Sequence, residues 1–203
     1  MKRIGKPLLF LVCLLPLLRL IWLATTNGLG ANPIEFITRS TGTWTLVGLL
    51  LTLGVTPLRR LTGWNGLIRY RRMLGLFAFF YACLHFTTYI WLDQFFDPAS
   101  IARDIVKRPF ITVGFAAFVL LLPLAFTSTR GMIRRLGRNW QRLHRLIYPI
   151  ALLGVLHYLW LVKKDVTQPL IYGAVLLILL ALRLPWGVSM LAAIGRRFRQ
   201  GGR

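Results

Sequence analysis

One segment, residues 139–161, reads NWQRLHRLIYPIALLGVLHYLWL and changes character along its length. It begins among arginines and continues as an apolar run that can lie within a membrane. Two of the chain's three histidines, His144 and His157, stand in this segment, thirteen positions apart. Because a titratable side chain in lipid is costly, histidines at such positions indicate a functional role.

The composition of the whole chain is that of an integral membrane protein. Of the 203 residues, 56% are hydrophobic and 15% are charged, and the mean hydropathy is +0.63. This balance lies outside the usual range of soluble proteins. The formal net charge is +21, but the basic residues fall in short clusters between apolar runs, as the positive-inside rule describes. We therefore expect a membrane environment and no nucleic-acid partner.

Six apolar segments predict six membrane helices, because only helices satisfy their own backbone hydrogen bonds in lipid at such lengths. The expected fold is all-α, a single six-transmembrane-helix bundle over residues 1–203. Several segments are shorter than the ~20 residues that cross a bilayer, so their ends must extend into the flanking residues. The segments are Leu8–Ala24, Trp44–Leu58, Met73–Leu92, Phe110–Phe126, Leu146–Val162 and Leu170–Leu184.

Charge separates the loops between these segments into two groups. One side holds 18 of the 26 basic residues, and the other side holds all five acids, Glu35, Asp93, Asp97, Asp104 and Asp165. The more basic side is cytoplasmic, so both termini are expected in the cytoplasm. Its basic residues are Lys2, Arg3, Lys6, Arg59, Arg60, Arg69, Arg71, Arg72, Arg130, Arg134, Arg135, Arg138, Arg142, Arg145, Arg196, Arg197, Arg199 and Arg203.

The two ends of the chain carry further expectations. The N-terminal segment starts basic and turns apolar like a signal peptide, but it lacks a small-residue cleavage site, so we expect a retained first span. No GxGxxG or P-loop pattern is present, and roughly twenty residues follow the last apolar segment. We therefore expect no nucleotide-binding domain in this chain.

Two histidines on different helices are expected at a similar depth, near the outer face of the membrane. His85 lies past the midpoint of the third apolar segment, and His157 lies in the outer half of the fifth. A bare zinc ion would require three or four ligands, and no cysteine or carboxylate lies at that depth. Haem needs one or two axial ligands, and its apolar macrocycle suits a helical bundle. The alternative for His85 is a core histidine that is hydrogen-bonded to a neighbouring hydroxyl group, such as that of Thr87 or Tyr89.

His144 is expected at the cytoplasmic end of the helix that carries His157. Thirteen residues at 1.5 Å rise separate the two by ~20 Å along the axis, which suits two stacked sites. At ~100° per residue, an undistorted helix would splay their side chains by about 140°. Both histidine side chains face the inside of the bundle only if the helix between them is distorted, and Pro149 is the residue expected to distort it. The alternative for His144, between Arg142 and Arg145, is an interfacial residue that contacts headgroups.

The spacing of the histidines and the sequence around them resemble those of the ferric-reductase-like transmembrane family. Within that family the closest resemblance is to haem-binding membrane subunits of bacterial periplasmic methionine-sulfoxide reductase systems. The resemblance runs through most of the chain. It is carried by RRMLGLFAFFYACLHFTTY (71–89), RPFITVG (108–114), LAFTST (124–129), LGRNWQRLHRLIYPIALLGVLHYLW (136–160) and QPLIYG (168–173).

The resemblance implies a multi-pass protein of the bacterial inner membrane with one or two b-type haems. By position, His85 and His157 would hold an outer haem iron, and His144 an inner one whose partner on the third segment is missing. Arg71 and Arg72 would lie near an inner site or near haem propionates, although positive-inside topology also explains both arginines.

The same resemblance implies an electron-transfer subunit and not a self-contained enzyme. Electrons would enter from a cytosolic flavin reductase or the quinone pool. They would leave to a periplasmic, molybdopterin-containing methionine-sulfoxide reductase that repairs oxidised proteins. Bound FMN is a further implication, for which these residues indicate no site.

Three other functions fit the same helices. A stand-alone ferric or oxygen reductase is disfavoured because the chain shows no FAD and NADPH domain. A proton or ion transporter that uses the histidines as relays is disfavoured because no acid stands within the apolar segments. A structural membrane subunit, with the histidines as core polar contacts, is the remaining alternative.

Overall fold

The computed structural model describes residues 5–200, with side chains described for residues 5–194. Of the predicted cytoplasmic basic residues, Lys2, Arg3 and Arg203 lie outside the described residues, as do the side chains of Arg196, Arg197 and Arg199. The described chain is helical. Its longer elements are α1 (Gly5–Thr25), α2 (Pro33–Thr62), α3 (Ile68–Thr88), α5 (Pro109–Phe126), α8 (Ile147–Leu161), α9 (Thr167–Ala181) and α10 (Pro185–Gln200).

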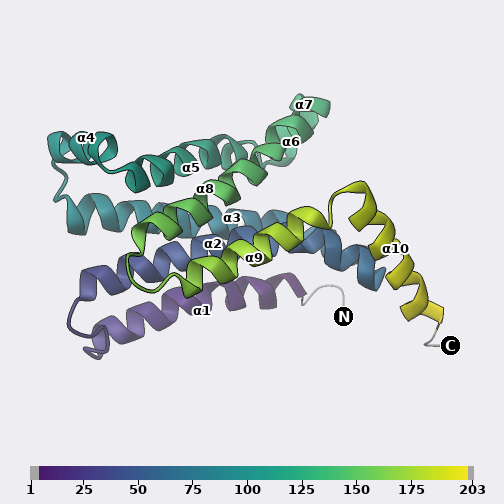
Figure 1. Cartoon of the computed structure of the whole chain (residues 1–203), viewed down its shortest axis with the longest axis horizontal. Helices are drawn as coiled ribbons and strands as arrows, with labels where there is room; N and C mark the ends of the chain where they lie inside the picture. The colour runs from purple at the N-terminus through teal and green to yellow at the C-terminus, as the bar shows by residue number, and fades with distance from the viewer. Residues whose placement is uncertain (1–4, 201–203) are drawn as a thin grey trace.

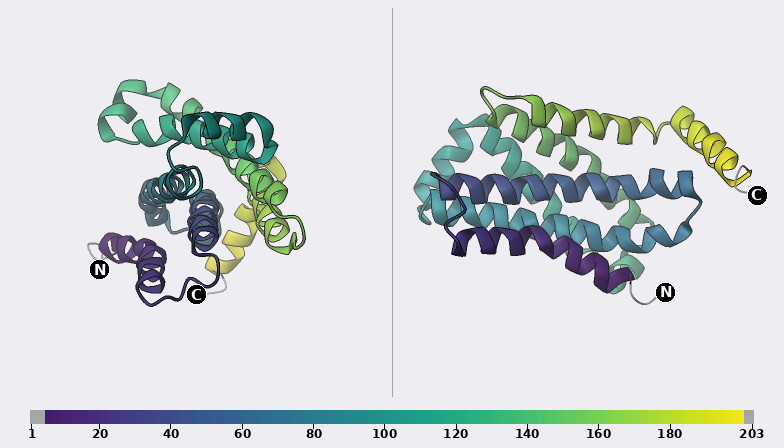
Figure 2. Two further views of the ribbon diagram at one scale, coloured as in Figure 1. Left: turned by 90° about the vertical axis from the view of Figure 1, so that its left-hand side faces the viewer. Right: turned by 90° about the horizontal axis from the view of Figure 1, so that it is seen from below.

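Short elements join the long helices at the two ends of the bundle. A π-helical turn, η2 (Tyr89–Asp93), and α4 (Pro98–Lys107) lie at one end. The opposite end holds α6 (Arg130–Leu136), α7 (Arg138–Leu143) and the 3₁₀ turns η1 (Asn65–Leu67) and η3 (His144–Leu146). Helices α1, α2, α3, α5, α8 and α9 run along the long axis, each opposite in direction to the one before (Figures 1 and 2).

Each of the six predicted apolar segments coincides with one of these helices, and the chain is an all-helical membrane protein with four to five candidate spans. Four stretches are long and apolar enough to cross a membrane: α1, α2, Asn65–Asp93 and α5. A fifth is added if α9 and the start of α10, bent by 86°, form one broken span. Helix α8 has only 15 residues, so the number six stays a prediction.

Helix α2 extends well beyond the apolar segment that predicted it, and its end signals explain why. The side chain of Asn32 accepts a hydrogen bond from the Glu35 amide at 3.2 Å, and Pro33 opens the first turn. Both residues are favoured at these positions of a helix. At the other end Gly63 takes a left-handed conformation, with φ of 71°, and caps the helix.

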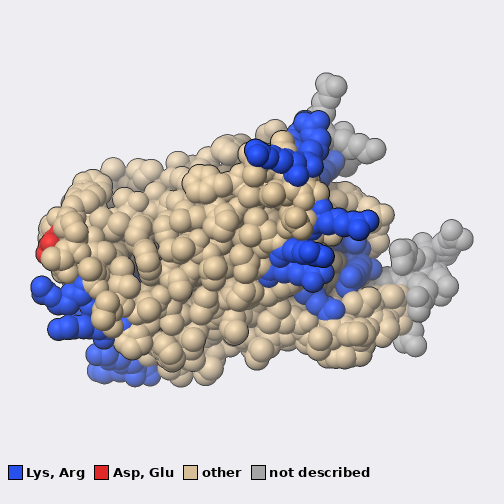
Figure 3. Space-filling model, turned by 90° about the horizontal axis from the view of Figure 1, so that it is seen from above, with Lys and Arg blue, Asp and Glu red and all other residues tan. Residues whose placement is uncertain are grey.

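Charged side chains gather at the two ends of the bundle, and a band with few charged side chains lies between the ends. Figure 3 shows Lys and Arg at both ends, with acidic side chains visible only at the end that carries α4. The first described turn of α1 and helix α10 lie at the other end, together with α6 and α7 (Figure 1). This distribution matches the loop charges predicted from the sequence.

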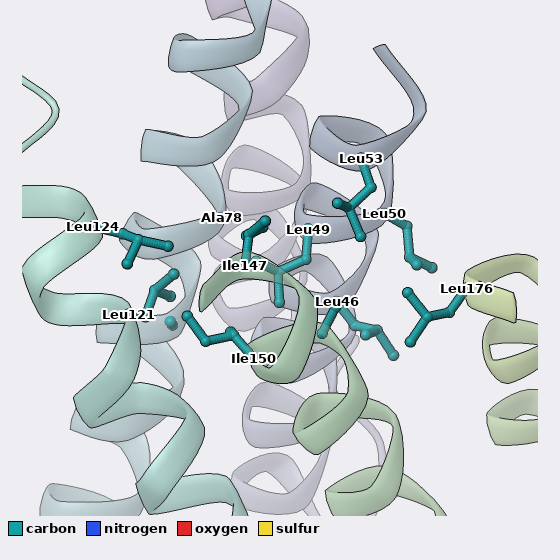
Figure 4. Close-up of a cluster of buried hydrophobic side chains, with 12 residues drawn as sticks. Leu46, Leu49, Leu50, Leu53, Ala78, Leu121, Leu124, Ile147, Ile150 and Leu176 are labelled. Atoms are coloured by element: carbon teal, nitrogen blue, oxygen red, sulfur yellow. The ribbon is translucent and has the colours of Figure 1, made fainter. Parts of the chain in front are cut away.

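The apolar core lies where α2, α3, α5, α8 and α9 meet. Leu53 of α2, Ile150 of α8 and Leu176 of α9 are 0–1% exposed, and the clustered side chains point toward one another (Figure 4). Small residues let α2 and α3 approach closely. A Cβ added to Gly48 would lie 2.9 Å from the Cβ of Ala78, which is itself fully buried. Close packing through small residues is typical of membrane helices.

Two prolines inside long helices stand beside backbone groups to which side chains bond. Pro57 has no N–H, so the carbonyl of Leu53, four residues earlier, loses its helical partner. Arg183, just after α9, donates to this carbonyl at 2.6 Å and to the Tyr148 hydroxyl at 3.1 Å. An unsatisfied carbonyl in hydrocarbon is costly, so Arg183 stabilises the junction of α2, α8 and α9.

The second proline, Pro16, stands inside helix α1, between two residues whose backbone groups bond to one side chain of α3. Here the hydroxyl of Tyr81 in α3 donates to the Cys13 carbonyl at 2.7 Å and accepts from the Leu17 amide at 3.2 Å. Those two backbone groups would bond directly to each other in a regular helix. Tyr81 therefore bonds to two backbone groups of α1 and attaches this peripheral helix to α3.

Replacing Tyr81 with phenylalanine should destabilise the bundle. The change keeps the ring but leaves two backbone groups of α1 without their partner, which costs about 1–3 kcal/mol in a dry environment. Thermal unfolding in detergent should show a lower midpoint for Tyr81→Phe. Tyr172→Phe is the matched control, because its hydroxyl bonds to no described residue. Equal midpoints for the two variants would contradict the role given to Tyr81.

Candidate cofactor site

His85 of α3 and His157 of α8 lie side by side in the interior of the bundle. Their ring centroids are 6.1 Å apart and their planes meet at 74°. A metal held between two imidazoles, with metal–nitrogen bonds of about 2.0 Å, would set ring centroids roughly 6 Å apart. The separation of the two rings therefore fits a shared metal ligated by both.

The proton positions on both rings follow from their hydrogen bonds. His85 Nδ1 lies 2.9 Å from the Thr38 carbonyl oxygen, and His157 Nδ1 lies 2.7 Å from that of Phe110. A carbonyl oxygen can only accept, so each Nδ1 carries the proton and each Nε2 keeps its lone pair. A histidine that ligates a metal through one nitrogen usually donates from the other in this way.

Glycines on the facing helices make room for both rings. A Cβ added to Gly42 of α2 would lie 3.0 Å from His85 Cε1, and one added to Gly114 of α5 would lie 2.6 Å from His157 Nδ1. In both halves of the site, the helix that offers the carbonyl carries the glycine four residues later. The α2–α3 and α5–α8 pairs thus hold their histidines by the same arrangement of carbonyl and glycine.

The two imidazoles open into a largely apolar cavity of about 310 Å³. This volume is at the lower end of the range typical of ligand sites. Phe86 and Phe118 stack in its wall, with ring centroids 4.5 Å apart, and Phe115 lies 5.9 Å from Phe86. Aromatic and aliphatic walls around two unprotonated nitrogens suit a flat, apolar, metal-containing macrocycle better than a hydrated ion.

His144 lies apart from this pair, in the 3₁₀ turn η3 between α7 and α8. Its Nδ1 donates to the Trp140 carbonyl at 3.0 Å, its ring stacks on Trp140 at 3.9 Å, and its Nε2 lies 3.4 Å from Ser128 Oγ. Because the Trp140 carbonyl can only accept, Nδ1 carries the proton, and Nε2 of the neutral ring can act as a ligand.

The helix distortion predicted between His144 and His157 occurs, but it precedes Pro149. The turn η3 winds at 3.0 residues per turn, which reduces the splay of the two side chains from about 140° to about 80°. Pro149 stands in the first turn of α8, where a missing N–H costs nothing. The chain has no fourth histidine, so His144 has no histidine partner within it.

Arg71 and Arg72 differ in their surroundings. Arg72 is exposed, whereas Arg71 is half-buried and lies near His144, Tyr148 and Arg183. Arg183 was not among the residues predicted to matter. Its place in the sequence does set it apart, because it is a basic residue inside the last apolar segment, on the side opposite to every acid.

Sequence comparisons with known proteins identify the family of the chain. Residues 39–155 match the family described as ferric reductase like transmembrane component. The chain is 62% identical over 184 residues to a protein from Herminiimonas arsenicoxydans, covering 89% of this chain and 84% of that protein. A Bordetella pertussis protein is 58% identical, over 88% of this chain and 87% of its own length. Both are named protein-methionine-sulfoxide reductase heme-binding subunit MsrQ. No solved structure matches.

Gly114→Ala should impair the site without unfolding the bundle. The added methyl group would force His157 away from the Phe110 carbonyl, so haem affinity should fall at least about tenfold, the effect of losing 1.4 kcal/mol. Titration of the purified apoprotein with haem measures this loss. Gly75→Ala in α3 is the control, because its Cβ would meet Thr52 only at an ordinary 3.7 Å. Equal affinities for the two variants would show that the glycine does not position the ligand.

Proposed function

The chain belongs to the ferric-reductase-like transmembrane family and, within it, to the MsrQ heme-binding subunits, and we propose that it is a transmembrane electron-transfer haem protein. Its partner would be a methionine-sulfoxide reductase, as the names of its relatives state for those proteins. The single observation that carries the proposal is the pair of Nδ1–H···O=C bonds, which leaves two Nε2 lone pairs in one apolar cavity.

We infer that His85 and His157 are the axial ligands of an outer b-type haem. When bound, haem supplies one-electron redox chemistry. With His85 and His157 both bound to its iron, the haem would have no open position for substrate, which would favour electron transfer over oxygen chemistry. The carbonyls of Thr38 and Phe110 keep the rings in the ligating tautomer, and the phenylalanines of the cavity wall exclude water.

The proposed topology has six crossings with both termini in the cytoplasm of a bacterial inner membrane. It is supported by the alternating directions of α1, α2, α3, α5, α8 and α9 (Figure 1), and by the loop charges. Helix α8 is short for a span, but η3 and α7 precede it without a loop and add nine residues. The His85–His157 pair then lies toward the periplasm, and His144 toward the cytoplasm.

Electrons would enter near His144 and leave from the outer pair. His144 is proposed to ligate a second, inner haem, with Arg71 or Arg72 near its carboxylates. About 20 Å of helix axis separates His144 from His157, so a carrier at the inner position would divide the route into shorter steps. The proposed donor is a cytosolic flavin reductase or quinol, with FMN as a further carrier, and the proposed acceptor is a periplasmic molybdopterin-containing methionine-sulfoxide reductase.

Absorption spectra of the purified protein test the outer site. Oxidised and dithionite-reduced wild type should give a six-coordinate b-haem spectrum. His157→Ala and His85→Ala should each lose nearly all of the outer haem, because a single imidazole leaves the iron one ligand short. A colourless wild-type protein, after expression with ample haem supply, would refute the proposal.

Haem content of His144→Ala distinguishes one haem from two. If the inner haem exists, the molar ratio of haem to protein should fall by about half, because one of two ligated irons is lost. Iron content by elemental analysis gives an independent count. A variant that retains the wild-type ratio would exclude the inner site and leave the outer site intact.

The electron donor can be tested in inverted membrane vesicles, which expose the cytoplasmic face. Reduced flavin supplied by a cytosolic flavin reductase should reduce the haem under anaerobic conditions, followed by the change in absorption. Reduction by a quinol alone, with no response to flavin, would assign entry to the quinone pool.

A further inference from the structure

The charged side chains that line the cavity around His85 and His157 stand at only one end of it. On α2 the lining residues run from Arg39 through Gly42, which faces His85, to Leu46 and Leu49. Between Arg39 and Leu49, ten positions apart, the helix rises about 15 Å, from a guanidinium to a leucine side chain. The cavity is therefore amphipathic along the bundle axis, with a cationic group at the end that carries α4.

Helix α5 repeats the same order on the other side of the cavity. Arg108 precedes this helix, Gly114 faces His157, and Ala117 and Leu121 follow. Arg39 and Arg108 thus stand at the same end of the cavity, the first on the α2–α3 pair and the second on the α5–α8 pair. We call this end the mouth of the cavity. Each arginine lies on the same side of its glycine, toward the end of the bundle that carries α4.

Tyr89 adds a hydroxyl to this mouth that lacks a partner. It stands four residues after His85 and therefore on the same helical face. Its hydroxyl is buried and has no hydrogen-bond partner within 3.5 Å among the described residues, although the carboxylates of Asp93 and Asp104 lie near it. A buried hydroxyl without a partner is costly, so this group indicates a ligand that accepts a hydrogen bond here.

The charged groups at the mouth leave both guanidiniums able to bind an anion. Arg39 pairs with Glu35 at 2.7 Å and Arg108 pairs with Asp104 at 3.4 Å, and the two arginine side chains remain 60% and 54% exposed. Each guanidinium has five N–H donors, so one carboxylate partner does not use all of them, and an exposed pair such as Arg39–Glu35 is weak. Of the nearby acids, Asp93 lines the cavity, while Glu35 and Asp104 each pair with one of the two arginines.

We propose that Arg39, Arg108 and Tyr89 bind the two propionate carboxylates of the haem held by His85 and His157. This inference rests on the proposed function and adds the orientation of the cofactor. Haem is an apolar ring with both carboxylates on one edge, and the cavity offers donors on one end. The reverse orientation would bury two carboxylates against Leu46, Leu49 and Leu121, where nothing compensates them.

This orientation bears on the exit of electrons. The carboxylate edge of the macrocycle faces the end of the bundle that carries α4, toward the proposed acceptor. The two guanidiniums also place positive charge near the iron, which favours the reduced form because that form carries one positive charge fewer. Arg39 and Arg108 therefore raise the reduction potential of the outer haem.

A porphyrin without free carboxylates tests the proposal directly. Apoprotein is titrated with iron protoporphyrin IX and with its dimethyl ester, which keeps the iron and ring but has no anionic group. Wild type should bind the free acid at least about tenfold more tightly than the ester, as expected for hydrogen bonds to a charged group. In Arg39→Gln/Arg108→Gln this preference should disappear, and in Tyr89→Phe it should decrease. Arg103→Gln, an α4 variant that does not line the cavity, should behave as wild type.

The midpoint potential gives a second readout that does not depend on activity. The double arginine variant should have a lower haem midpoint potential than wild type, and Arg103→Gln should not. An unchanged preference for the free acid in the double variant would overturn the propionate assignment while the bis-histidine spectrum upholds the proposed function. Failure of wild type to give a six-coordinate spectrum with either porphyrin would overturn both.

Discussion

The hydrogen bond from each buried histidine to a backbone carbonyl is the interaction on which the site depends. It joins α3 to α2 through Thr38 and α8 to α5 through Phe110, at 2.9 Å and 2.7 Å. The same bond fixes the tautomer, so helix packing and ligand chemistry are set together. Neither ring could lie so close to its neighbouring helix if Gly42 or Gly114 carried a side chain.

A membrane explains why this protein satisfies its backbone so thoroughly with side chains. Without water, each carbonyl or amide that a proline frees must find another partner. Arg183 bonds to the Leu53 carbonyl that Pro57 releases, and Tyr81 bridges Cys13 and Leu17 beside Pro16. These contacts attach α9 and α1 to the central helices and hold the four helices of the site in place.

The positions of the helices and the pairing of His85 with His157 could be predicted because they depend on local apolar runs and on depth. Depth follows from residue number once the direction of each helix is known. The carbonyl partners could not be predicted, since Thr38 and Phe110 each lie 47 residues from their histidines. Helix rotation decides which backbone groups face a ring, and a single sequence with six similar apolar segments does not specify rotation.

His144 and Arg183 show two further limits of the sequence. In a regular helix, the side chain of His144 would point far away from the helix face that carries His157. The 3₁₀ turn that begins at His144 reduces this angle, and the presence of Pro149 alone does not predict that turn. Arg183 was one cation among many on its side of the bundle. Only its proximity to the Leu53 carbonyl, 130 residues away along the chain, reveals its role.

The central claim is that two imidazoles, oriented by backbone carbonyls, hold one iron. Electron paramagnetic resonance of the oxidised His144→Ala protein tests it most directly, because this variant retains only the outer pair of histidines. The claim predicts a low-spin ferric signal of the strongly anisotropic type that nearly perpendicular ligand planes produce, as expected from the 74° between the rings. A high-spin ferric signal, the mark of an iron with a missing axial ligand, would contradict it.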